Sequence, residues 1–409
     1  MVPNGWEVKP LSSITKWSSG GTPSKSNPDY WSGEIPWISA ASMRGHYFNK
    51  SELKITDLAV SNGAKMAPKD SLLLLVRGSM LWNKIPVGIA ARRVSFNQDV
   101  KCLIPHADEL TTEFLLYWFL TYEHRLMNMV TGTGIGAGKL DTTDLQGLDV
   151  FLPPLPEQRK ISKILSAWDK AIATTEKLIE TSKQQKKALM QQLLTGGKRL
   201  VDPETGKVFE EEWEEVNVGS IANLTAGGTP STKHPEYWGG YILWMNSGEI
   251  NLKQIFSVEG RITQLGLEKS NTKEIPSNSV LIALAGQGKT RGTVAINRIP
   301  LCTNQSIAAL IPDREKVCSE FLYFNLDSRY QELRSMSTGD GGRGGLNLSI
   351  LRSIKLRTPT IPEQKKIASV LTAADKEIEE LKTKLVHLKQ EKKALMQQLL
   401  TGKRRVKID

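Results

Sequence analysis

The sequence contains little cysteine and no long apolar run. Its 409 residues include only Cys102, Cys302 and Cys318, which form no CxxC pair and no spacing typical of a metal site. Isolated cysteines in a chain of this length favour a reducing compartment, so we expect a cytoplasmic protein. The longest apolar runs, 72–76 and 280–285, are too short to cross a bilayer. The first residues also lack the basic and apolar regions of a secretory signal.

Motifs that would carry a reaction are broken or absent. Residues 283–290 match a relaxed phosphate-loop pattern, but the residues after them indicate a turn and a strand where that loop requires a helix. Residues 27–30 read Asn-Pro-Asp-Tyr, which lacks the second proline of the amino-methyltransferase motif Asn-Pro-Pro-Tyr. The five histidines are scattered along the chain. We therefore expect no catalytic residue and no metal site in this chain.

Two glycine-rich segments, 132–138 and 339–345, overlap a loose dinucleotide fingerprint but lack the flanking strand and helix. A loop that approaches DNA or a partner closely and a flexible connector are both consistent with them.

Positive charge is concentrated in two segments. The formal net charge is +11 and the isoelectric point is near 9.3, which favours a polyanionic partner. Residues 157–199 hold ten Lys and Arg against four Asp and Glu, and residues 360–409 hold twelve against seven. These segments account for the whole net charge. DNA contact by the remaining chain therefore requires local patches of basic residues.

The chain consists of two copies of one unit. KKALMQQLLTG at 186–196 recurs unchanged at 392–402, and GGTPSKSNPDYW at 20–31 returns as GGTPSTKHPEYW at 227–238. Each copy has a variable region of about 150 residues followed by a near-constant segment of about 45. We expect variable globular regions at 1–153 and 200–359, and helical segments at 154–199 and 360–409.

The near-constant segments are predicted to be long helices. From Ile367 to Leu399, nine of ten positions at alternating spacings of four and three are apolar, and Lys392 is the exception. The same spacing from Ile161 to Leu193 gives seven of ten, with Lys186 at the corresponding place. A single core-facing helix is the alternative. The length of the apolar face in both copies favours pairing of two helices as an antiparallel coiled coil with pseudo-twofold symmetry.

The variable regions are predicted to be mixed α/β (α+β). Short apolar runs separated by Gly, Pro and Asn indicate strands, and one helical stretch follows in each copy. The expected strands are 34–38, 71–76, 87–90 and 100–104 in the first copy and 241–245, 280–285, 293–296 and 307–311 in the second, with helices at 112–130 and 319–336.

This organisation resembles the specificity subunit of type I restriction–modification systems. The resemblance covers essentially the whole chain, and the PEQ(R/K)KI…KKALMQQLLTG helices at 156–196 and 362–402 carry it most specifically. It implies two target recognition domains that each read one half of a bipartite DNA site. It also implies a coiled coil that sets the spacer and docks two modification subunits, with restriction subunits for cleavage. S-adenosylmethionine, ATP and Mg²⁺ would belong to those partners.

Candidate DNA-contacting residues are basic or amide side chains in loops, because Arg and Lys read guanine and Asn and Gln read adenine. A solvated surface charge is the alternative for each of them. The candidates are Lys25, Arg44, Arg77, Lys84, Arg92 and Lys139 in the first copy, and Lys233, Asn246, Gln287, Lys289, Arg291 and Arg343 in the second. Candidate partner-docking residues, expected on the exposed faces of the helices, are Lys183, Gln184, Gln185, Lys186, Lys392, Lys393 and Gln397. GGTPS, which both copies share, is expected to form a structural turn.

Three alternative functions stay open at the level of sequence. One is a specificity subunit that serves a fused restriction–methylation enzyme. Another is a coiled-coil adaptor without DNA contact, which the neutral recognition regions permit. The third, a self-contained methyltransferase or nucleotide-dependent enzyme, is disfavoured by the broken motifs.

Overall fold

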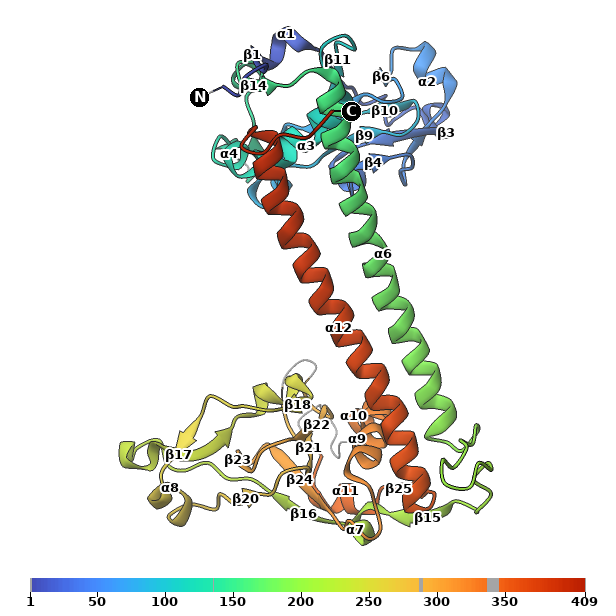
Figure 1. The fold of residues 1–409 in the computed structure, drawn as a ribbon, viewed down its shortest axis with the longest axis vertical. Helices are drawn as coiled ribbons and strands as arrows, with labels where there is room; N and C mark the ends of the chain where they lie inside the picture. Colours follow the sequence, from blue (N-terminus) through green and yellow to red (C-terminus); the bar gives the residue numbers. More distant parts are fainter. Residues whose placement is uncertain (1, 135, 287–289, 337–345, 409) are drawn as a thin grey trace. The chain divides into compact units, whose positions relative to one another are not determined.

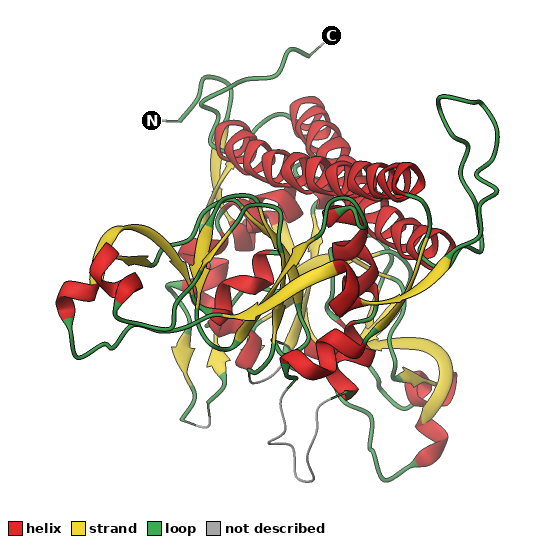
Figure 2. Cartoon of the chain, turned by 90° about the horizontal axis from the view of Figure 1, so that it is seen from below, coloured by secondary structure: helices red, strands yellow, loops and turns green. Residues whose placement is uncertain are grey.

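The computed structural model describes residues 2–134, 136–286, 290–336 and 346–408 (Figure 1). The chain forms two compact units. Unit 1 comprises Met1–Glu176 and Thr383–Asp409, and unit 2 comprises Lys177–Lys382. Each unit therefore combines one globular region with one part of each of two long helices, α6 (Leu155–Leu193) and α12 (Ile361–Leu400). Strands and helices are mixed in both globular regions (Figure 2).

Unit 1 is built around a five-stranded sheet with the order β2-β11-β7-β9-β4. All four residues of its central strand β7 are buried, which explains the unbroken leucine run in the sequence. A four-stranded sheet has the order β5-β3-β10-β6, and smaller sheets pair β12-β13-β8 and β1-β14. The strands are β1 (Glu7–Pro10), β2 (Thr15–Ser19), β3 (Trp31–Ile38), β4 (Tyr47–Phe48), β5 (Lys54–Ile55), β6 (Met66–Ala67), β7 (Leu72–Leu75), β8 (Arg77–Gly78), β9 (Val87–Ala90), β10 (Val94–Phe96), β11 (Val100–Pro105), β12 (Thr131–Gly132), β13 (Gly138–Lys139) and β14 (Asp149–Leu152).

Unit 2 repeats this architecture. Its five-stranded sheet has the order β16-β24-β21-β22-β18, its four-stranded sheet β19-β17-β23-β20, and β15 pairs with β25. The strands are β15 (Glu214–Asn217), β16 (Ala222–Ala226), β17 (Trp238–Met245), β18 (Gln254–Ile255), β19 (Arg261–Ile262), β20 (Glu274–Ile275), β21 (Val280–Ala283), β22 (Val294–Asn297), β23 (Leu301–Thr303), β24 (Ile307–Pro312) and β25 (Lys355–Thr358). The internal repeat and the mixed α/β prediction are confirmed.

The short helices occur at matching places in the two units. In unit 1 they are α1 (Leu11–Ile14), α2 (Asp57–Ser61), α3 (Thr112–Thr121), α4 (Glu123–Met127) and α5 (Thr142–Gln146), with 3-10 turns η1 (Pro28–Tyr30), η2 (Ala40–Ser42) and η3 (Ser79–Trp82). In unit 2 they are α7 (Val218–Ile221), α8 (Gln264–Glu268), α9 (Ser319–Ser328), α10 (Tyr330–Ser335) and α11 (Leu348–Ser353), with η4 (Pro235–Tyr237) and η5 (Ser247–Leu252).

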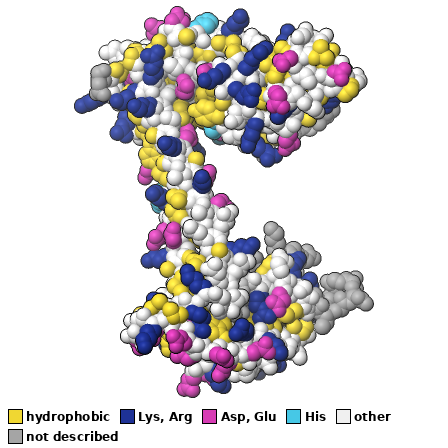
Figure 3. Space-filling view, turned by 90° about the vertical axis from the view of Figure 1, so that its right-hand side faces the viewer, with side chains coloured by type: hydrophobic (Ala, Val, Ile, Leu, Met, Phe, Trp, Pro, Cys, Tyr) yellow, Lys and Arg dark blue, Asp and Glu magenta, His cyan; other side chains and the backbone are white. Residues whose placement is uncertain are grey.

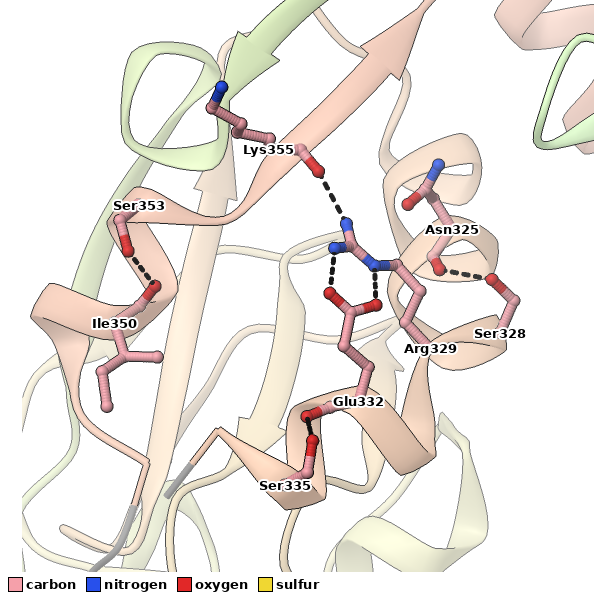
Figure 4. A network of polar contacts seen from close by, with 8 residues as sticks. All are labelled: Asn325, Ser328, Arg329, Glu332, Ser335, Ile350, Ser353 and Lys355. Atoms are coloured by element: carbon pink, nitrogen blue, oxygen red, sulfur yellow. Dashed lines mark hydrogen bonds and ion pairs between the residues drawn. The ribbon is translucent and has the colours of Figure 1, made fainter. Parts of the chain in front are cut away.

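The single helix predicted near the end of each variable region is wrong, because each stretch is two helices. The break falls at Tyr122 between α3 and α4, and at Arg329 between α9 and α10. Arg329 bonds the carboxylate of Glu332 and donates to the main-chain oxygen of Lys355 at 2.7 Å (Figure 4). Its guanidinium thus links the start of α10 to β25.

The two long helices pair in antiparallel fashion within each unit. In unit 1, Asp169 and Glu176 of α6 contact Lys392 and Lys389 of α12, so residue numbers rise along one helix as they fall along the other. In unit 2, Ser182 and Lys186 of α6 contact Glu377 and Asp375 of α12 in the same sense. The predicted coiled coil is confirmed.

Candidate nucleic-acid interface

Two basic side chains lie opposite each other on the small sheet of unit 1. Arg77 on β8 pairs directly with Lys139 on the antiparallel strand β13, and both residues are exposed. Side chains of directly opposed residues project from the same face of a sheet, and like charges there are unfavourable. Lys139 is partly neutralised by Asp141 at 3.4 Å, whereas Arg77 makes no ion pair with any residue that the structure describes. A bound anion would relieve this repulsion.

An exposed tryptophan stands beside these cations. Trp82, the last residue of η3, is 48% exposed and donates its indole N–H to the main-chain oxygen of Gly136 at 3.1 Å. The exposed Lys84 follows two residues later. Large aromatic side chains combined with basic ones are typical of nucleic-acid surfaces. The sequence prediction missed Trp82, although a tryptophan between Arg77 and Lys84 was a usable signal.

Glycine is required where β13 pairs with β8 in this sheet. A Cβ atom added to Gly138 would lie 2.7 Å from Cγ1 of Val130. Gly78, which pairs with Gly138, has φ +149°, a conformation that favours glycine. Gly138 and Gly78 therefore allow close packing of the backbone beside Arg77 and Lys139.

The other candidates of unit 1 occupy different exposed loops. Lys25 lies between β2 and η1, Arg44 between η2 and β4, and Arg92 between β9 and β10. Within the described parts of the chain, no hydrogen bond or ion pair joins these three side chains to Arg77, Lys84 or Lys139. The structure thus pairs two of the six candidates of the first copy, Arg77 and Lys139, and Lys84 lies seven residues after Arg77 in the chain.

In unit 2 the structure changes the interpretation of Asn246. Its side-chain oxygen accepts a hydrogen bond from the N–H of Gly248 at 2.8 Å, and its amide donates to Glu249 at 2.8 Å. The main-chain N–H of Asn246 also donates to Glu249 at 2.9 Å as part of a capping box at the start of η5, so the side chain is engaged in local structure. Lys233 is exposed and Arg291 is half-buried. Gln287, Lys289 and Arg343 lie outside the described residues.

The shared GGTPS segments are irregular loop segments, and each is followed by a turn that begins at Lys25 in the first copy and at Thr232 in the second. Thr22 bonds Gln98 at 2.6 Å and Thr229 bonds Gln305 at 2.5 Å. A Cβ added to Gly20 would lie 2.2 Å from the main-chain oxygen of Asn97. Both segments are therefore held tightly against the neighbouring strand ends, but the predicted turn lies just after each segment and not within it.

The predicted docking residues on the helices separate into two groups. One group is exposed: Lys183, Gln184, Gln185, Lys393 and Gln397. The other group consists of Lys186 and Lys392, which were predicted on exposed faces. That placement is wrong, because their side chains are only 15% and 12% exposed and each pairs with an aspartate of the other helix.

Charge on the surface of the units is mixed. On the face shown in Figure 3, Lys and Arg side chains alternate with Asp and Glu in both globular regions. Among the described residues, no group of His, Cys, Asp and Glu could hold a metal ion. No helix in the same residues has the length and apolar character needed to span a membrane.

The fold and the duplicated regions place the chain in a known class of protein. The family model for the type I restriction modification DNA specificity domain matches twice, at residues 3–184 and 210–390. The chain therefore belongs to this family, and it is a specificity subunit with two DNA-specificity domains. This confirms the resemblance inferred from the sequence and disfavours the adaptor without DNA contact.

Individual relatives agree with this assignment. The chain is 26% identical to a putative type I restriction enzyme MjaX specificity subunit of Methanocaldococcus jannaschii, over 99% of this chain and 95% of that protein. It is 32% identical to the EcoR124I/EcoR124II specificity subunit of Escherichia coli over 40% of this chain and 41% of that protein.

Solved structures share the fold. A type I restriction-modification S subunit from M. genitalium aligns with a TM-score of 0.60 at 18% identity, over 97% of this chain and 96% of that one. A chain from a study of assembly and conformational transition of the type I system aligns with a TM-score of 0.61 at 16% identity, over 99% of this chain and 100% of that one.

Proposed function

We propose that the two globular regions each read one half of a bipartite DNA target, and that α6 and α12 set the length of the unread spacer between the halves. The observation that carries this proposal is the duplication of one α/β region on paired helices. Two copies of one reader that differ in their loops are suited to two different half-sites.

In unit 1 we assign DNA contact to the surface of Arg77, Lys139, Trp82 and Lys84. Arg77 supports this role because its charge faces Lys139 and is not balanced by a described acidic partner. An arginine without an internal partner keeps its donors available for a guanine edge or a phosphate. Lys84 is suited to a phosphate, because a flexible ammonium acts as a point charge.

Methylation and cleavage are assigned to partner subunits, which would also bind S-adenosylmethionine, ATP and Mg²⁺. The exposed residues Lys183, Gln184, Gln185, Lys393 and Gln397 lie on the repeated segments of α6 and α12. Repetition of a surface favours two equivalent sites for one kind of partner. We therefore propose two modification subunits for each specificity chain.

The test is to reconstitute the chain with its modification subunit and map the methylated bases on genomic DNA. The expected result is a single bipartite motif with a spacer of fixed length. A contiguous motif, or methylation without sequence preference, would contradict the proposal. Native mass spectrometry of the same complex should show two modification subunits, and a saturated one-to-one complex would contradict the stoichiometry.

A further inference from the structure

One buried aromatic side chain of unit 1 meets a charged pair from the two long helices. Tyr117, the sixth residue of α3, donates its hydroxyl proton to Oδ2 of Asp169 on α6 at 2.8 Å. Nζ of Lys392 on α12 lies 2.5 Å from Oδ1 of the same carboxylate and 5.4 Å from the centre of the tyrosine ring. Burial, together with Asp169, raises the pKa of Tyr117, so its hydroxyl stays protonated and donates. Three elements thus meet at Asp169.

We call this set of contacts, from Tyr117 to Asp169 and Lys392, a junction. Unit 2 contains an equivalent junction at matching positions. Nζ of Lys186 on α6 lies 2.5 Å from Oδ1 of Asp375 on α12 and 5.2 Å from the centre of the Phe324 ring. Phe324 is the sixth residue of α9, as Tyr117 is of α3. The two lysines and the two aspartates also occupy matching positions in α6 and α12. The phenylalanine lacks the hydroxyl, so the second junction has one hydrogen bond fewer.

Each junction explains why the apolar face of its helices is interrupted by a lysine. An apolar side chain at Lys186 or Lys392 would continue the apolar face. A partly desolvated ion pair contributes little net stability, but it accepts only one arrangement of its partners. The lysine side chains are 12% and 15% exposed and the aspartates 38% and 39%, so the charges are shielded without being fully removed from water.

We propose that these two junctions, Tyr117–Asp169–Lys392 and Phe324–Asp375–Lys186, fix the orientation of each recognition region on the helix pair and thereby restrict the complex to one spacer length. These are positioning residues, because they lie between a globular region and both helices and act on DNA only through that orientation. A rotation of one reader by about 35°, together with a shift of about 3.4 Å along the duplex, would bring it to a half-site displaced by one base pair. The inference depends on the proposed bipartite readout.

The experiment compares methylation by the complete complex on duplexes whose spacer is native, or one or two base pairs longer or shorter. The variants are Lys392→Leu and Lys186→Leu. The matched control is Lys389→Leu, which breaks an exposed pair with Glu176, 2.7 Å long, on the same two helices. All proteins are also tested for helicity and for binding of the modification subunit.

For Lys392→Leu, the rate on altered spacers relative to the native spacer should rise about tenfold, because hydrogen bonds to charged groups contribute about that factor. The half-site bases should stay unchanged, and Lys389→Leu should keep the native preference. Lys186→Leu should give the larger change, since Phe324 offers no hydroxyl to hold Asp375.

A folded Lys392→Leu complex that keeps the native spacer preference would overturn the inference. If that variant does not fold, Lys392→Gln removes the charge at similar length and is judged by the same two outcomes. Failure of the wild-type complex to show any bipartite motif would instead contradict the proposed function, so the two failures are distinguishable.

Discussion

The two units differ in the contacts made by the first turn of a long helix, which is α6 in unit 1 and α12 in unit 2. In unit 1, Glu157 is fully buried and receives two hydrogen bonds from Arg405 and a third from the indole of Trp6 at 3.1 Å. In unit 2, Glu363 receives two bonds from Arg199, while the indole N–H of Trp213 is buried without a partner.

Both guanidinium groups are bound strongly. Hydrogen bonding to the carboxylates raises the pKa of Arg199 and of Arg405, so both pairs stay charged. The duplicated helices therefore keep the same ion pair between a buried glutamate and an arginine, whereas the surrounding polar contacts have diverged. β8, β12 and β13 of unit 1 form a small sheet, and the residues of unit 2 that correspond to β12 and β13 lie outside the described residues.

The largest effect is expected from lengthening the helices that both units share. Insertion of one heptad into α6 and one into α12 preserves the apolar face. Seven residues add about 10 Å, which corresponds to about three base pairs. Methylation mapping should show a spacer longer by up to about three base pairs with unchanged half-sites. An insertion in one helix alone should mismatch the pair and destabilise the protein.

Removal of the arginine from each of these two ion pairs should lower the free energy of unfolding by different amounts in the two units. Arg199→Ala leaves Glu363 buried without that partner and should cost about 3 kcal/mol, whereas Arg405→Ala should cost about 2 kcal/mol because Trp6 still donates to Glu157. Denaturant unfolding measures both. Lys355→Ala, which removes an exposed pair with Glu215, is the control and should leave the free energy of unfolding nearly unchanged. Equal losses for both arginines would contradict the comparison.

Changes on the DNA surface of unit 1 should separate readout from phosphate contact. Lys84→Ala should weaken all DNA sequences about equally and reduce the slope of log affinity against log salt by about 1. Arg77→Ala should relax preference at one base of one half-site, with a loss of about 1–3 kcal/mol. Lys69→Ala, at an exposed turn residue between β6 and β7 that is not a DNA-contact candidate, is the control in quantitative binding assays with the assembled complex. Identical behaviour of the three variants would argue against this surface.

The smallest effect is expected from the two equivalent tryptophans. Trp6→Phe loses a hydrogen bond to a buried carboxylate and should cost about 1–2 kcal/mol more than Trp213→Phe, which loses no hydrogen bond and removes an unpaired buried N–H. Thermal unfolding with both single variants and the double variant tests this difference. A larger loss for Trp213→Phe would show that packing outweighs the hydrogen bond.

The architecture was predictable because its signals are local or repeated. The alternating spacing from Ile367 to Leu399 predicts α12, and the repeat predicts that unit 2 has the topology of unit 1. The breaks at Tyr122 and Arg329 were not predictable, since apolar spacing continues across them and Arg329 acts through Lys355, a residue 26 positions away.

The candidate site was predicted less completely. Charge alone selected Arg77, Lys84 and Lys139 without showing that Arg77 and Lys139 are strand partners. It also selected Asn246, whose amide is engaged in a cap, and it placed Lys186 and Lys392 on exposed faces. Their aspartate partners lie 189 and 223 residues away, and no local pattern identifies such pairs.

The central claim is that two independent readers share one pair of helices. It is tested most directly by replacing residues 1–153 with the corresponding region of another specificity subunit and mapping methylation by the assembled complex. The account predicts a motif in which one half-site is exchanged, while the other half-site and the spacer stay as in the parent. A motif with both half-sites altered would contradict independent readout by the two units.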